Sequence, residues 1–207
     1  MVLKELSLTK YSLYIFCVFT LGCSHPKEQK AINIFENFGI LKIPNDTILG
    51  NNTSLKLQNG VYYFGSNTFS GYIKSNYNSV TLKSIASFFQ GKQHGVTKTF
   101  FPNGKLETER NYRNGLAYGR HFGYFQNEKM KFDFMYLNDK REGVQKQWYE
   151  SGKKYYELTF TGDQENGMQK AWRENGKPFI NYEVKDGERY GLQKAALCYT
   201  LKNEILK

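Results

Sequence analysis

The chain has 207 residues, with 29 Lys and Arg against 19 Asp and Glu, and its aromatic residues are 16 Tyr, 16 Phe and 2 Trp. This length predicts one or two domains, and the aromatic content excludes an intrinsically disordered chain. Three cysteines are too few for a disulfide-rich secreted scaffold. No segment beyond the N-terminal region approaches the roughly 18 apolar residues of a membrane-spanning helix. The net charge of +10 allows an anionic partner without identifying one.

The N-terminal residues have the pattern of an export segment. Tyr11–Leu21 contains no charge, and its eleven residues match a signal-peptide core and are too few to span a bilayer. The sequence Thr20-Leu21-Gly22-Cys23 resembles the lipobox of bacterial lipoproteins, in which the cysteine is lipidated and becomes the first mature residue. We therefore expect a lipoprotein signal peptide at 1–22, lipidation at Cys23, and a protein anchored to a membrane of the bacterial cell envelope, periplasmic or surface-exposed. A plainly cleaved signal peptide and a retained anchor are the alternatives.

Residues 23–54 should hold the lipidated cysteine, a polar tether and an irregular N-terminal cap, followed by a repeat domain at 55–207. Ser24–Lys30 is polar, whereas 31–54 is apolar without a period and is interrupted by Pro44 and Gly50, so we expect a cap or an extra strand there. Removing 1–22 takes away two lysines and one glutamate, which leaves a charge of +9 on the exported part.

A repeat of 24 residues organises the rest of the chain. The repeat is marked by a glycine, by an aromatic residue five positions later and by a lysine ten positions later. The glycines are Gly71, Gly95, Gly119, Gly143, Gly167 and Gly191, the aromatic residues are Phe100, Tyr124, Trp148 and Trp172, and the lysines are Lys105, Lys129, Lys153 and Lys177.

Each repeat predicts a β-hairpin. Asn103-Gly104 and Asn175-Gly176 are typical of a two-residue type I′ turn, which needs positive φ at both central residues. The strand after each turn alternates apolar and polar residues, as in Phe132-Asp133-Phe134. No helical period separates the hairpins, so we expect an all-β fold, a single-layer meander or solenoid of antiparallel hairpins stabilised by contacts between neighbouring repeats.

This turn also predicts which residues face each other across the hairpins. Lys98 should lie opposite Glu109, Lys146 opposite Glu157, and Lys170 opposite Asn181. The same register places Phe100, Tyr124, Trp148 and Trp172 on the face opposite Phe132, Phe134 and Tyr136. Aromatic rings should therefore occupy both faces of one curled sheet.

The pattern of Gly, aromatic pair and Asn-Gly-Lys resembles the MORN-variant repeat of bacterial proteins, including the YwqK-type antitoxin family. The resemblance covers Gly71 to Gly191 and implies the hairpin repeat fold. It departs from the motif at Asn127-Glu128 and at 78–82, where we expect longer or looser turns.

Catalytic chemistry has little support in the sequence. His25, His94 and His121 occupy different positions of the repeat, so we expect no metal site. Cys198 is expected to be a small apolar residue of a terminal strand rather than a nucleophile. Glu109, Asp133 and Glu157 form a column, but their lysine partners favour ion pairs over glycosidase chemistry. We therefore expect no enzyme activity and no cofactor.

Two sets of residues are candidate binding groups. The first set, Tyr124, Trp148, Tyr149 and Trp172, supplies aromatic anchors for a protein partner. The second set, Lys105, Lys129, Lys153 and Lys177, lines the hairpin tips, where it serves either solubility or an anionic lipid or glycan surface. We expect an exported protein-interaction platform. The resemblance implies an alternative, an antitoxin-like or immunity-like role with a toxin as partner. Nucleic acid is not expected as a partner of an exported protein.

Overall fold

The computed structural model describes residues 42–193, which belong to one compact unit. The predicted signal peptide, Cys23, His25 and Cys198 lie outside the described residues. Within these residues, no helix is long and apolar enough to cross a membrane. The predicted all-β meander is confirmed.

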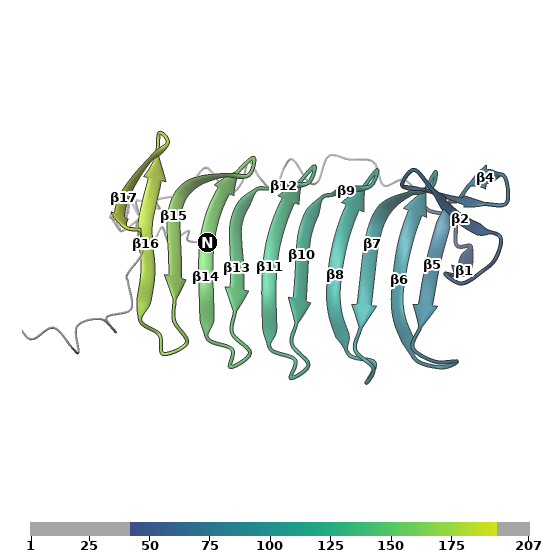
Figure 1. Cartoon of the computed structure of the whole chain (residues 1–207), viewed down its shortest axis with the longest axis horizontal. Helices are drawn as coiled ribbons and strands as arrows, with labels where there is room; N and C mark the ends of the chain where they lie inside the picture. The colour runs from purple at the N-terminus through teal and green to yellow at the C-terminus, as the bar shows by residue number, and fades with distance from the viewer. Residues whose placement is uncertain (1–41, 194–207) are drawn as a thin grey trace, which may run out of the picture. The chain divides into compact units, whose positions relative to one another are not determined.

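The described residues form one large sheet of 14 strands and a small sheet of three strands. In the large sheet the strands run side by side in chain order as a row, from blue to yellow in Figure 1. Its strands are β1 (Thr47–Leu49), β5 (Gly71–Asn76), β6 (Leu82–Phe89), β7 (Lys92–Phe100), β8 (Leu106–Arg113), β9 (Leu116–Ala117), β10 (Gly119–Tyr124), β11 (Met130–Leu137), β12 (Lys140–Arg141), β13 (Gly143–Trp148), β14 (Lys154–Thr161), β15 (Gln164–Trp172), β16 (Pro178–Lys185) and β17 (Glu188–Leu192). All neighbouring strands pair antiparallel except β1 and β5, which pair parallel.

The N-terminal end of the sheet is closed by residues outside the repeat. Strand β1 covers the outer edge of β5, and the Tyr72 N–H donates to the Asp46 carbonyl at 2.7 Å. The small sheet consists of β2 (Leu55–Gln58), β3 (Val61–Phe64) and β4 (Asn67–Thr68). The buried ring of Phe69 lies between the rings of Phe64 and Phe88, 6.4 Å from each, which joins the two sheets.

The hairpin turns differ from the predicted type. Phe101 N–H donates to the Lys105 carbonyl, and Gly104 N–H donates to the Phe101 carbonyl, both at 2.8 Å. Gly104 has a φ of 80°, whereas Asn103 does not have a positive φ. The loop therefore has three residues, a type I turn followed by a left-handed glycine, and the predicted two-residue turn is wrong. Asn103 contributes through its side chain instead, because its Oδ1 accepts from the Lys105 N–H at 3.1 Å.

The predicted register is nevertheless confirmed. Lys98 lies opposite Glu109, and the same holds for Lys146 with Glu157 and for Lys170 with Asn181. A three-residue loop shifts the pairing by one residue relative to a two-residue loop, but a β-bulge between Thr99 and Phe100 shifts it back. Each of the internal hairpins carries this bulge at the same place, so the two shifts cancel.

Two-residue turns with positive φ at both positions occur at the other end of the strands, in the links between hairpins. Asn114 and Gly115 have φ of 50° and 86° and connect the paired residues Arg113 and Leu116. The equivalent links are Gln90-Gly91, Asn138-Asp139, Gly162-Asp163 and Asp186-Gly187. Some links also join neighbouring repeats: Asp139 N–H donates to the Ala117 carbonyl at 3.0 Å.

The two hairpins that depart from the motif have loops of the ordinary length. Glu128 adopts a φ of 65° in place of the turn glycine, and its N–H donates to the Phe125 carbonyl at 2.9 Å. In the first hairpin, Tyr77 N–H pairs with the Thr81 carbonyl at 2.9 Å, as Phe101 does with Lys105. The expectation of longer turns is wrong. At Glu128 a non-glycine residue takes the left-handed conformation at a cost of about 1–2 kcal/mol. In the first hairpin no residue of 78–81 has a positive φ, and the Val80 N–H donates to Asn78 Oδ1, which agrees with the alternative expectation of a looser turn.

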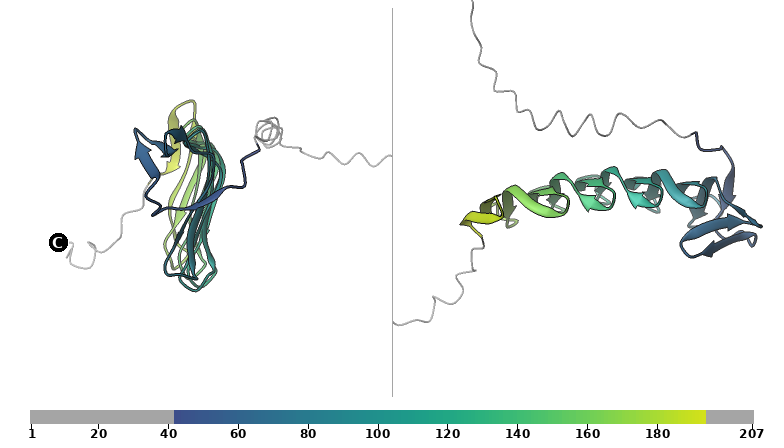
Figure 2. Two further views of the ribbon diagram at one scale, coloured as in Figure 1. Left: turned by 90° about the vertical axis from the view of Figure 1, so that its right-hand side faces the viewer. Right: turned by 90° about the horizontal axis from the view of Figure 1, so that it is seen from above.

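The sheet has two distinct faces, and it projects as one curved layer when viewed along the row (Figure 2). One face, here called the aromatic face, carries Phe132, Phe134 and Tyr136. Stacking between hairpins occurs on it, since the rings of Phe134 and Tyr156 are 6.3 Å apart and nearly parallel. The buried core lies on the same face, where Phe88, Phe160 and Val184 lie opposite the repeat glycines.

A column of polar side chains is buried beneath this face, two positions after each repeat glycine. It consists of His121, Gln145 and Gln169, while Thr97 at the equivalent position is half-buried. Gln145 is 2% exposed; its Nε2 donates to the Met135 carbonyl at 3.0 Å and its Oε1 accepts from the Met135 N–H at 3.2 Å. His121 Nε2 and Gln169 Nε2 lie 2.6 and 2.7 Å from the equivalent carbonyls of Asn111 and Thr159. These side chains thus satisfy backbone groups where the strand pairing between hairpins is irregular.

Candidate interaction surfaces

The face opposite the aromatic face combines lysines with large rings, and we call it the lysine–tryptophan face. Lys98, Lys146 and Lys170 lie on it three positions after a repeat glycine, and Trp148 and Trp172 lie two positions further on. Residues two apart on a strand share a face, so each lysine lies on the same side as the ring that follows it. Tyr124 occupies the equivalent position one hairpin earlier.

The acidic column of this face is ion-paired throughout. Lys98 Nζ lies 3.2 Å from Glu109, Arg120 Nε lies 2.7 Å from Asp133, and Lys154 Nζ lies 2.6 Å from Glu157. The sequence identifies the column and the Lys98 partner. It misses Arg120 as the partner of Asp133 and Lys154 as the partner of Glu157. The bulge in β14 brings residue 154 toward residue 157.

Glu157 stands among three lysines. Lys146 and Lys170 lie opposite it on the two neighbouring strands, and Lys154 holds its carboxylate. The hydrogen bond from Lys154, followed by the charges of Lys154, Lys146 and Lys170, lowers the pKa of Glu157 against the opposing effect of burial. Within residues 42–193, Lys146 and Lys170 make no ion pair, so this part of the face has an excess of positive charge.

The tryptophans border the same three lysines. The Lys154 ammonium lies 5.4 Å from the centre of the Trp172 ring, a cation–π contact. Trp148 is paired with Lys154 across the hairpin. Both tryptophans and Tyr124 are half-buried, so one side of each ring remains available for contact.

Tyr149 lies apart from the other predicted aromatic anchors. Its ring packs against Tyr155 at 5.0 Å, and Tyr155 packs against Tyr156 of the aromatic face at 5.2 Å. Its hydroxyl donates to the Trp172 carbonyl at 2.9 Å, which joins two hairpin tips. The structure therefore brings Tyr124, Trp148 and Trp172 onto one face and gives Tyr149 a contact between repeats.

The lysines at the hairpin tips are exposed, and two of them contact the next tip. Lys105 forms an ion pair with Glu128, and Lys129 Nζ donates to the Ser151 carbonyl at 2.6 Å. Lys153 and Lys177 are exposed. Acidic residues stand at three of the tips, namely Glu128, Glu150 and Glu174. This edge consequently carries mixed charge, which gives it less attraction for an anionic surface than the lysines alone indicate.

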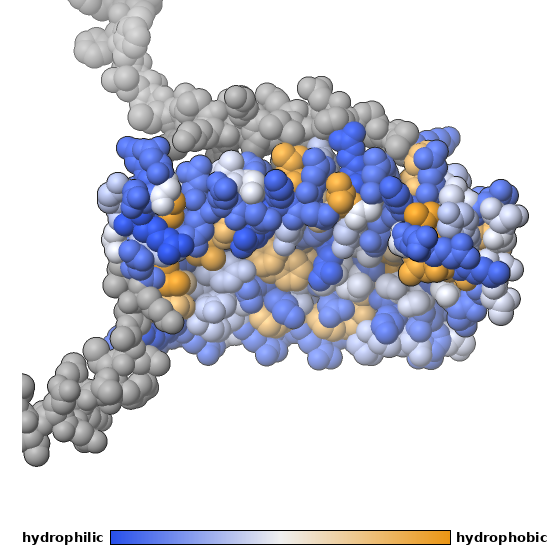
Figure 3. Space-filling model, turned by 45° about the horizontal axis from the view of Figure 1, so that its top comes forward, coloured by the Kyte–Doolittle hydropathy of each residue, from blue (hydrophilic) through white to orange (hydrophobic). Residues whose placement is uncertain are grey.

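The aromatic face has one small hollow of about 190 Å³ lined by rings. Phe134, Tyr136, Tyr156 and Phe160 are among its walls, with Arg141 at its edge. The Arg141 guanidinium lies 3.9 Å from the centre of the Phe160 ring and Arg141 Nε donates to Asp163 at 2.7 Å. Its charge is therefore already neutralised. In the space-filling view, apolar residues form separate small groups among hydrophilic ones (Figure 3).

The described residues contain no group of three His, Cys, Asp or Glu side chains that could hold a metal ion. His121 is buried, and burial lowers its pKa, so the neutral ring is favoured. His94 Nδ1 lies 3.2 Å from Asn114 Oδ1 at a link turn. These two histidines thus have structural contacts, and the absence of enzyme activity stays a prediction.

Two segments of the chain match the MORN repeat variant, residues 93–114 and residues 141–161. The first runs from β7 through β8 to the following link, and the second from β12 through β14. Their starts are 48 residues apart, which is two repeats. The match confirms the repeat type of these hairpins. A search of curated proteins finds no significant match to the chain.

Proposed function

We propose that the protein is a non-enzymatic binding protein whose lysine–tryptophan face recognises an acidic surface of a partner protein. The observation that carries the proposal is the cluster of Lys146, Lys154 and Lys170 around a single Glu157, bordered by Trp148 and Trp172. Repeat sheets offer extended surfaces for such contacts, and the MORN-variant match is consistent with a repeat protein of this kind.

The chemistry of the cluster fits an acidic protein surface. Two lysines without an ion-pair partner among the described residues supply attraction over a distance of about 8–10 Å at ordinary salt concentrations. Trp is enriched among residues that dominate binding energy, and its ring buries a large area when a partner covers it. The lysines would therefore steer the partner, and the rings would hold it.

We further propose that the protein acts in the cell envelope, held by a lipid on Cys23. The lipobox-like Thr20-Leu21-Gly22-Cys23 supports this location. In cells fed a radiolabelled fatty acid, the native protein should take up label and sediment with membranes. Cys23→Ser should abolish both, and equal labelling of this variant would contradict the proposal.

Cross-linking of the native protein in its own cells tests the binding proposal. Trp148→Ala and Trp172→Ala should each reduce recovery of a specific partner at least tenfold, and Lys170→Gln should make the remaining binding less sensitive to salt. Leu116→Ala is the control, because Leu116 is an apolar, 41% exposed residue that lies in β9, beside a link turn and away from the hairpin tips. Full recovery of every partner by both tryptophan variants would overturn the proposal.

The same experiment distinguishes the other roles that the sequence implies. A partner whose toxicity is relieved on co-expression would identify an immunity-like role for the same face. Binding to anionic vesicles that is lost when Lys153 and Lys177 are changed to Gln, with no protein partner recovered, would replace the proposal by a lipid-binding role.

A further inference from the structure

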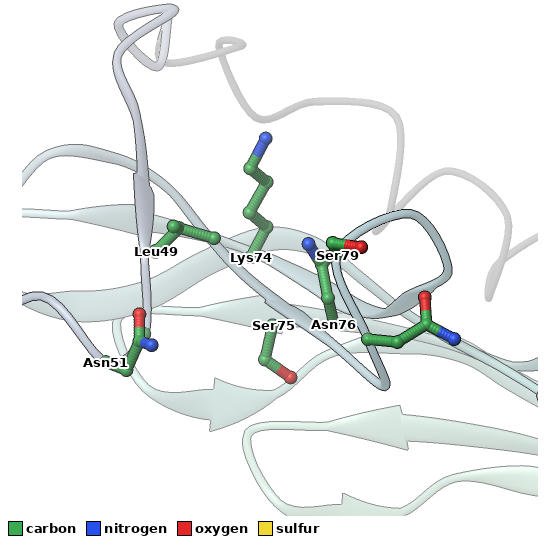
Figure 4. Close-up of a pocket in the computed structure, with 8 residues that line it drawn as sticks. Leu49, Asn51, Lys74, Ser75, Asn76 and Ser79 are labelled. Carbon is green, nitrogen blue, oxygen red and sulfur yellow. The ribbon is translucent and has the colours of Figure 1, made fainter.

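A polar pocket of about 380 Å³ lies at the N-terminal end of the lysine–tryptophan face. Its walls come from the non-repeat turn after β1 and from the first hairpin, β5–β6 (Figure 4). The lining residues are Leu49, Gly50, Asn51, Lys74, Ser75, Asn76, Asn78 and Ser79. Its volume falls within the range of small-molecule sites.

The first hairpin departs from the repeat at several positions in and beside this pocket. Lys74 is the counterpart of Lys98 and Lys146, but Ile85 stands opposite it where those lysines face Glu109 and Glu157. The ammonium of Lys74 consequently lacks the acid that its column provides elsewhere, and it makes no ion pair within residues 42–193.

Two further departures replace repeat features by hydrogen-bonding groups. Asn76 takes the position that Phe100, Tyr124, Trp148 and Trp172 hold in later hairpins. The loop that follows reads Asn78-Ser79-Val80-Thr81 in place of the Asn-Gly-Lys motif, and Val80 at its tip is 88% exposed. Local violations of a pattern that the rest of a chain obeys are expected at functional sites.

The pocket offers one positive charge, several neutral polar groups and no carboxylate. Within the described residues, the amides of Asn51 and Asn76 and the hydroxyl of Ser79 make no hydrogen bond, whereas Asn78 Oδ1 accepts from the Val80 and Thr81 N–H groups. In Figure 4, Leu49 of β1 lies beside Lys74, and register places the two opposite each other. Leu49 thus adds an apolar surface next to the charge.

We propose that this pocket binds an acidic sugar, a ligand with one carboxylate and several hydroxyl groups. Lys74 would pair with the carboxylate, and the amides of Asn51 and Asn76 would each donate to one hydroxyl and accept from another. Leu49 would cover the apolar side of the ring. The pocket lies at the opposite end of the sheet from Trp172, so this proposal stands independently of the partner-binding proposal.

Calorimetric titration of the full chain in detergent tests the proposal, with D-galacturonic acid as the probe. Galacturonic acid should bind, while galactose should bind at least tenfold more weakly because it lacks the carboxylate. Acetate and N-acetyl-glutamate amide serve as the simple anion and the peptide-like acid.

Lys74→Gln should weaken binding at least tenfold, whereas Lys98→Gln, the same column position one hairpin later, should leave it unchanged. Asn76→Asp keeps the shape of the side chain and adds a negative charge, and it should abolish binding even if Lys74→Gln fails to fold. Equal binding of galactose, equal or tighter binding of acetate or the glutamate derivative, unchanged binding by Asn76→Asp, or no binding of galacturonic acid would each overturn the proposal.

Discussion

Replacing Gln145 with leucine should destabilise the protein much more than the same change at Gln169, although the two residues occupy equivalent positions and are 2% and 0% exposed. Gln145 is bonded at both ends, since its Nε2 donates to the Met135 carbonyl and its Oε1 accepts from the Met135 N–H. In Gln169 only Nε2 is bonded, and Oε1 is buried without a partner among the described residues.

The difference can be estimated from the groups left without a partner. Gln145→Leu strands the Met135 N–H and removes the Nε2 bonds, which together cost about 2–4 kcal/mol, because an unsatisfied buried polar group costs about 1–3 kcal/mol and an ordinary hydrogen bond contributes about 1 kcal/mol. Gln169→Leu removes a comparable donor but also eliminates an unpaired buried oxygen, so its net cost should be within about 1 kcal/mol of zero. Leucine matches glutamine closely in size, so neither change creates a large cavity.

Urea unfolding of the full chain, followed by circular dichroism, measures both free energies of unfolding. Hydrogen exchange at the Met135 amide gives a local readout, because a repeat sheet can open one hairpin at a time. That amide should exchange much faster in the Gln145→Leu variant and should be unaffected in Gln169→Leu. Equal losses of stability in the two variants, or a slow Met135 amide in the first, would refute the assignment of this column to backbone satisfaction.

Three further outcomes are expected. Glu128→Gly should raise stability by up to about 1 kcal/mol in thermal unfolding, because the relief of a φ of 65° exceeds the value of the exposed ion pair with Lys105; a loss of stability would contradict this. Burial lowers the pKa of His121 below its ordinary 6.5, so its contribution to stability is complete above that pH and is lost as the pH falls from there through the folded-state pKa. In the His121→Gln variant, the urea concentration at which half of the protein is unfolded should therefore fall less steeply as the pH is lowered. An unchanged dependence on pH would exclude His121 as the source of this decline. Tyr149→Phe should cost about 0.5–1.5 kcal/mol by removing the bond to the Trp172 carbonyl, with Tyr190→Phe, whose side chain is 61% exposed, as the neutral control.

The 24-residue repeat made most of the fold predictable from the sequence. The predicted register is correct because the three-residue loop and the β-bulge shift the strand pairing by one residue in opposite directions. The spacing of Asn103-Gly104 predicts a two-residue turn, and the structure has a three-residue loop plus a bulge at Glu107. A two-residue turn and a three-residue loop with a bulge both place Lys98 opposite Glu109, because the same number of residues separates the two in either arrangement. The register is therefore predictable where the turn type is not. The two-residue turn that Asn-Gly predicts does occur at Asn114-Gly115, where both residues have a positive φ.

The candidate surfaces were less predictable, because they depend on which side chains find partners. The positions of Trp148 and Trp172 follow from the repeat, whereas the capture of Glu157 by Lys154 depends on the bulge. The buried column through Gln145 and Gln169 carries a readable signal, an amide at the same repeat position in successive hairpins. It is easily missed because glutamine is ordinarily an exposed residue.

The pocket beside β1 shows what the repeat can and cannot indicate about function. In the next hairpin, Lys98 faces Glu109 and forms an ion pair with it, so the requirements of the fold account for that lysine. In the first hairpin the acid is replaced by Ile85, the ring by Asn76 and the Asn-Gly-Lys tip by a different loop, and the last two replacements contribute Asn76, Asn78 and Ser79 to the hollow beside Lys74. Stability does not require this combination, because the next hairpin folds with the motif residues in the same positions. The position of the hollow could not be predicted from the repeat, since one wall comes from Leu49–Asn51, outside it. Two of these departures supply walls of a pocket beside a lysine that makes no ion pair within residues 42–193, which is the reason to look for a ligand there before the regular hairpins.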